Sequence, residues 1–98
     1  MRPRHRLLFD LVLAMHAADD LGLPVCGLHL STAIDQLVMT LPAAQLGWLD
    51  EARNGLRSPL TIDLAHLRQH LVFCRECCDD LGLMLVGAYV VMAAEDLP

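Results

Sequence analysis

The most constraining feature of this 98-residue sequence is an internal repeat with an offset of 60 residues. Residues 7–37 match residues 67–97 at eleven of 31 positions, and five consecutive identities form the segment Asp-Asp-Leu-Gly-Leu. Non-identical pairs such as Val25 and Leu85 keep their apolar character. A repeat of this kind indicates one structural unit that is used twice in the chain.

Each copy has the pattern of two helices joined by a tight turn. In the first copy, Gly22 supplies a residue that can adopt positive φ just past a helix end, and Pro24 fits the first turn of the next helix. Pro42 then ends the second helix. The apolar residues of the first helix recur at the spacing of an amphipathic helix; they are Leu7, Leu8, Leu11, Val12, Met15 and Ala18.

The second copy repeats this arrangement with a more apolar final helix. Ser58-Pro59 or Thr61 is expected to open its first helix, and Gly82 to end it. The apolar stripe expected on that helix comprises Leu60, Leu64, Leu67, Leu71, Phe73 and Cys74. The final helix, from Leu83 to about Asp96, is apolar nearly all round, so we expect it to be buried on several sides.

A connector over residues 42–58 links the copies and is expected to form a short helix followed by an Asn-Gly turn. We interpret Trp48 as a lid packed on the bundle rather than as a ligand platform. The predicted fold is all-α, a duplicated helical hairpin that forms a four-helix bundle-like domain with a short connecting helix. Residues 1–98 form the one expected domain, with repeat 1 over about residues 5–41 and repeat 2 over about 59–97.

Composition bears on the class of partner. The chain is 55 % hydrophobic and 19 % charged, while a domain of this size buries only about two-thirds of the surface that its unfolded chain exposes. We therefore expect a homo-oligomer, a dimer in the first instance. The net charge of −5 argues against nucleic acid as a partner. A short basic arm at the start of the chain, Arg2, Arg4, His5 and Arg6, is interpreted as a solvated terminus.

Two apolar segments resemble membrane or export signals without matching them. Asp10 interrupts the apolar stretch near the start of the chain, which a secretory signal would not tolerate well. Residues 81–94 lack charge over only 14 positions, fewer than a bilayer span requires. Four cysteines, three of them clustered, do not resemble a secreted disulfide framework. We expect a cytoplasmic protein with no membrane contact.

One helix face collects four side chains that are able to bind metal: His66, His70, Cys74 and Cys77. The outer two would lie about 16 Å apart, so at most two or three would serve one ion. Cys74, Cys77 and Cys78 also align with alanines of the first copy, which favours small buried side chains. We expect structural cysteines and no cofactor, and keep a metal or thiol sensor as the alternative.

Two acidic pairs, Asp19-Asp20 and Asp79-Asp80, fall where the helix dipole disfavours negative charge. Either the carboxylates reach across the tight turn to the start of the next helix, or the four of them form a surface that receives arginines from a partner. The sequence leaves both explanations open.

No nucleophile or acid–base motif is present at a recognisable spacing, so we expect no catalytic residues and no enzyme activity. The surplus of apolar residues lies mainly in 81–94. The expected interface lies on the final helix and on its equivalent in the first copy, the second helix, and the residues named for it are Met84, Val86, Tyr89, Val90 and Met92. The sequence therefore predicts a non-enzymatic module that binds a second copy, or another protein, through apolar helix surfaces.

Overall fold

The computed structural model describes residues 3–54 and 63–98, and it is helical throughout most of that length. The helices are α1 (Pro3–Asp20), α2 (Pro24–Val38), the 3₁₀ turn η1 (Ala43–Gln45), α3 (Leu49–Asn54), α4 (Leu64–Leu81) and α5 (Met84–Glu95). This confirms the all-α, four-helix bundle-like fold built from two helical hairpins with a short connecting helix.

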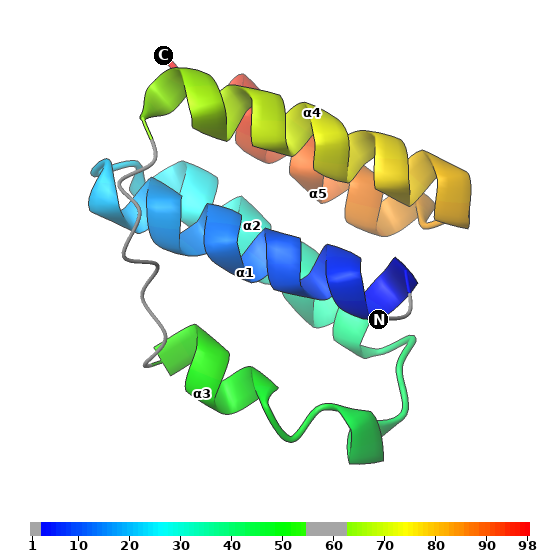
Figure 1. The fold of residues 1–98 in the computed structure, drawn as a ribbon. Helices are drawn as coiled ribbons and strands as arrows, with labels where there is room; N and C mark the ends of the chain where they lie inside the picture. Colours follow the sequence, from blue (N-terminus) through cyan, green and yellow to red (C-terminus); the bar gives the residue numbers. More distant parts are fainter. Residues whose placement is uncertain (1–2, 55–62) are drawn as a thin grey trace.

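The four long helices form two layers. Each hairpin packs its own two helices together, and the hairpins meet through α1 against α4 and through α2 against α5. In Figure 1, α1 and α4 lie in front, with α2 and α5 behind them. We call these pairs the front layer and the rear layer. Helices α1 and α4 run in opposite directions, so equivalent ends of the two hairpins lie at opposite ends of the bundle (Figure 1).

Both hairpins turn in the same way. Gly22 and Gly82 adopt φ values of 72° and 69°, a left-handed conformation that disfavours residues with a Cβ. Leu23 N donates to Ala18 O, and Leu83 N donates to Cys78 O, both at 2.9 Å. These bonds satisfy carbonyls that the helix end leaves without partners.

A single apolar cluster joins the helices. Both layers contribute to it, and the side chains from the two hairpins include repeat-related pairs such as Leu7 with Leu67 and Leu11 with Leu71. The largest fully buried members are Leu7, Leu8, Leu11, Leu30, Ile34, Leu37, Leu67, Leu71 and Val90. Among the described residues, no helix is long and apolar enough to cross a membrane.

Two helix starts differ from the sequence-based expectation. Helix α1 already begins at Pro3, so Arg4, His5 and Arg6 belong to its first turn rather than to a solvated arm. Helix α4 begins at Leu64, where Asp63 caps it by accepting a hydrogen bond from His66 N. An aspartate at this position satisfies one of the free N–H groups of the first turn. The expected start at residues 58–61, the stripe residue Leu60 and Arg2 lie outside the described residues.

Helix α3 covers the outer side of the first hairpin. Its Leu49 and Ala52 are buried, and His16 of α1 donates through Nε2 to Ala52 O at 2.7 Å. Trp48, which immediately precedes α3, packs against Phe9 with ring centroids 6.4 Å apart. The lid interpretation of Trp48 is therefore confirmed. In Figure 1, α3 lies on the side of α1 that is remote from α4.

A cation fixes α3 to the second helix of the same hairpin. Arg53 donates to Asp35 Oδ1 at 2.8 Å and to Ser31 Oγ at 2.7 Å, and both acceptors belong to α2. Helix α3 therefore bridges α1 and α2 along their outer groove.

Candidate interaction surfaces

The structure divides the five predicted interface residues of α5 between core and surface. Val86 and Val90 are buried in the core cluster, so their placement on an interface was wrong. Met84 is 88 % exposed and Met92 is 41 % exposed, while Tyr89 is half-buried. The helix is apolar on all sides, and periodicity alone does not separate its core positions from its outward positions.

Exposed apolar side chains occur on α2 as well as on α5. Leu85 is exposed at the start of α5, and Val25 and Leu28 are exposed at the start of α2. The sequence analysis expected a contribution from the second helix but named none of its residues. The spacing of Val25 and Leu28 was the available signal, because it puts them on a side of α2 away from the core residues Leu30 and Leu37.

The two layers differ sharply in charge. Helices α2 and α5 contain one charged residue each, Asp35 and Glu95, and no arginine. The front layer contains five charged residues on each helix: Arg4, Arg6, Asp10, Asp19 and Asp20 on α1, and Arg68, Arg75, Glu76, Asp79 and Asp80 on α4. Depletion of charge beside exposed apolar side chains is characteristic of the centre of protein interfaces.

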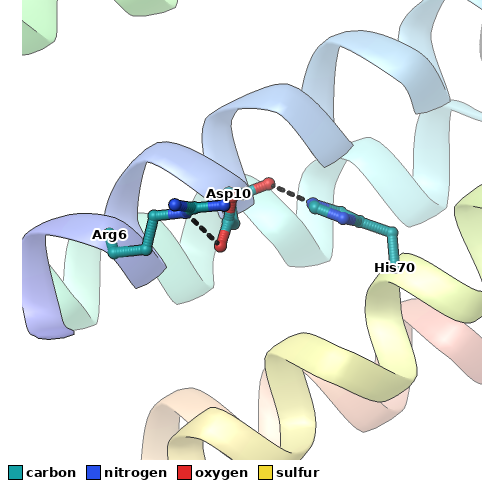
Figure 2. Close-up of polar contacts among 3 residues, drawn as sticks. All are labelled: Arg6, Asp10 and His70. Atoms are coloured by element: carbon teal, nitrogen blue, oxygen red, sulfur yellow. Dashed lines mark hydrogen bonds and ion pairs between the residues drawn. The ribbon is translucent and has the colours of Figure 1, made fainter.

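A polar contact lies in the middle of the front layer. Asp10 is 4 % exposed, and its carboxylate accepts from Arg6 Nε, which lies 3.3 Å from Oδ2 and 3.4 Å from Oδ1. His70 of α4 points at α1 and donates through Nε2 to the Asp10 backbone carbonyl at 2.8 Å (Figure 2). Positions 10 and 70 are equivalents under the repeat offset, so their contact lies close to the approximate twofold axis of the bundle.

The contacts among Arg6, Asp10 and His70 have a structural role, because they link α4 to α1. An ionised carboxylate inside a protein requires a charged partner, and Arg6 supplies it one helical turn away. His70 is committed to a backbone carbonyl, the same kind of bond that His16 makes to α3. Sequence reasoning treated Asp10 only as an interruption of an apolar stretch. The four-residue spacing from Arg6 was the signal that it is paired.

The histidines that the metal-binding alternative would use as ligands make other contacts. His66 donates through Nδ1 to Asp63 Oδ1 at 2.7 Å, as part of the cap of α4, and His70 is bonded to α1. Cys74 is fully buried, whereas Cys77 is half-buried. In the part of the chain that the structure describes, no group of three or more His, Cys, Asp or Glu side chains is placed to hold a metal ion.

The thiols are also poorly suited to redox sensing. Burial raises the pKa of Cys26 and of Cys78 to about 11, and it raises the pKa of Cys74 further, with the Asp10 carboxylate adding to the effect. Burial, followed by nearby acidic groups, also raises the pKa of Cys77. The reactive thiolate form is therefore scarce at neutral pH. Cys74 and Cys78 instead fill the places that Ala14 and Ala18 fill in the first hairpin, as small buried side chains.

The acidic pairs do not form one surface. Asp19 and Asp20 end α1, whereas Asp79 and Asp80 end the antiparallel α4 at the opposite end of the bundle (Figure 1). The alternative of a single four-carboxylate surface is therefore wrong. Use of either pair by a partner stays a prediction.

Asp19 shows what one of these carboxylates does within the chain. A Cβ at Gly27 would lie 2.8 Å from Asp19 Oδ1, so this carboxylate lies over the first turn of α2. Negative charge is favourable at that end of a helix.

Comparison of the chain with family models, with curated proteins and with solved structures gave no match.

Proposed function

We propose that this protein is a non-enzymatic interaction module that forms a homodimer through its rear layer. The observation that carries the proposal is the contrast between layers: the exposed apolar side chains Val25, Leu28, Leu85 and Met92 lie on the two helices that are almost free of charge.

Electrostatics favours this face over the others. Each copy has a net charge of −5, so two copies repel one another. The repulsion and the cost of removing charges from water are smallest where charged side chains are fewest, which is the rear layer. The face is also built from two repeat-related helices, and a twofold dimer needs a surface that is complementary to itself.

The test is sedimentation equilibrium of the wild-type protein and of the double variant Leu85→Glu, Met92→Glu. We expect the wild type to dimerise at micromolar concentration and the variant to be monomeric, because four carboxylates would then meet across the twofold interface. Both substituted positions are exposed, so the variant should keep its far-ultraviolet circular dichroism.

The matched control is Val72→Asp on α4, which adds a carboxylate at an exposed apolar position outside the rear layer. This variant should dimerise like the wild type. A wild-type protein that remains monomeric at about 100 μM would overturn the proposal, since a functional dimer should form in that range.

A further inference from the structure

A groove of about 330 Å³ lies between α4 and α5 on the outer side of the second hairpin. Its apolar lining includes Leu71, Val72, Val91 and Ala94. Val72 is 52 % exposed, although it lies in the middle of α4. The groove is therefore an apolar surface that the described chain leaves uncovered.

The repeat shows what such a groove accepts. Under the 60-residue offset, Val72 corresponds to Val12, and Val91 and Glu95 correspond to Ser31 and Asp35. Those residues of the first hairpin border the groove that α3 bridges: Arg53 of α3 bonds to both Ser31 and Asp35. Val12 is only 2 % exposed. One hairpin thus carries a short helix in its outer groove, and no helix of the described residues occupies the groove of the other.

Charge distinguishes the uncovered groove from its covered counterpart. Arg68 and Arg75 line it, where the first hairpin has the buried residues Leu8 and Met15. Both arginines are exposed and lie on one side of α4, seven residues apart. Helix α3 itself carries two acidic residues, Asp50 and Glu51, beside its buried Leu49. A helix of this composition would complement the groove in both apolarity and charge.

We propose that the α4/α5 groove binds a short amphipathic helix of a partner protein, with apolar residues three positions apart and carboxylates that pair with Arg68 and Arg75. A basic residue on the same helix would pair with Glu95, as Arg53 pairs with Asp35 in the first hairpin. This site shares α5 with the rear layer but includes none of the exposed residues proposed for the dimer interface, and it goes beyond the proposed function.

The probe is a synthetic peptide that carries the sequence of residues 47–54 inside an alanine-rich helix, because so short a segment is not helical alone. Binding is followed by nuclear magnetic resonance titration of the labelled protein. We expect shifts at Val72, Val91 and Ala94. Val72→Asp and Arg75→Glu should each weaken binding by about tenfold. Leu28→Asp, at an exposed apolar position of the rear layer, should leave it unchanged.

A second peptide tests the charge argument. With Asp50→Lys and Glu51→Lys, the peptide should bind the wild type weakly and the Arg75→Glu variant more strongly. The proposal is overturned by an absence of groove shifts at about 1 mM peptide. Shifts confined to α1 and α2 would also overturn it, because they would mean that the peptide only replaces α3. Loss of the protein's own dimer in Val72→Asp would assign the groove to a second copy instead.

Discussion

Helices α1 and α4 are each 18 residues long and hold equivalent places in the two hairpins, yet nine residues of α1 are buried and four of α4. The difference lies on their outer sides. Helix α3 and Trp48 cover α1, whereas the described chain places nothing comparable on α4. Repeated sequence therefore preserves the turn and the core contacts, while burial of the outer side of α1 depends on the segment that follows the first hairpin.

The largest expected effect comes from placing a carboxylate at the same position of both helices. Val12→Asp should lower the free energy of unfolding by about 4 kcal/mol or more, because it buries an unpaired charge under α3. Val72→Asp should change it by no more than about 0.5 kcal/mol. Urea denaturation measures both values. Equal losses for the two variants would contradict the asymmetry.

The pH dependence of stability at alkaline pH should reflect the cysteines that replace alanines in the second hairpin. Burial raises the pKa of Cys78 from 9.0 to about 11, so the folded state favours the protonated thiol. Stability from this group is complete below pH 9 and is lost as pH rises through the folded pKa, on the order of 2 kcal/mol by pH 11.

The variant Cys78→Ala copies Ala18 of the first hairpin and removes this group. Its unfolding free energy should fall less steeply between pH 9 and 11 than that of the wild type. Denaturation series at several pH values provide the measurement, and parallel curves for the two proteins would refute the assignment.

The two hairpin turns should respond alike to substitution, whereas the outer sides of α1 and α4 should not. Gly22→Ala and Gly82→Ala each force a Cβ into the left-handed region and should cost about 1 to 2 kcal/mol. Thermal unfolding of the two variants checks this. A difference between them as large as the effect itself would show that the two turns are not energetically equivalent.

The smallest expected effect is a difference in stability between alanine variants of Gly27 and Gly87, the two glycines that lie where helices pack closely. Alanine is favoured over glycine in a helix by up to about 1 kcal/mol. At Gly27 the nearest obstacle is the terminal oxygen of exposed Asp19, which can rotate away, so Gly27→Ala should be neutral or stabilising. At Gly87 the obstacle is Cys78 Cβ at 3.3 Å, fixed on a buried face, so Gly87→Ala should gain less or lose stability. Melting temperatures in the reverse order would contradict this reasoning.

Local signals in the sequence were sufficient for the hairpins. Gly22 and Gly82 marked both turns, and the apolar spacing of α1 identified Leu7 and Leu11 as core residues. The connector helix also followed from short-range pattern. These features depend on neighbours a few residues apart, which is the range over which propensity and periodicity act.

The surfaces required knowledge of packing over long distances in sequence. Val90 and Met92 lie two residues apart on an apolar helix, and only the positions of α2 and α4 decide that one is buried and the other exposed. Phe73 was expected in the core stripe of α4 but is exposed, because no described helix covers the outer side of α4 as α3 covers α1. The contact of His70 with Asp10 likewise joins residues 60 positions apart.

The chain contains a single tryptophan, and it lies where α3 meets α1, with its ring against Phe9. Intrinsic fluorescence of this protein is consequently a local probe of how α3 packs on the first hairpin, whereas circular dichroism averages over all the helices. A fluorescence transition that precedes the loss of helicity on heating would mean that α3 detaches while the bundle persists, and coincident transitions would mean that cover and bundle unfold as one cooperative unit.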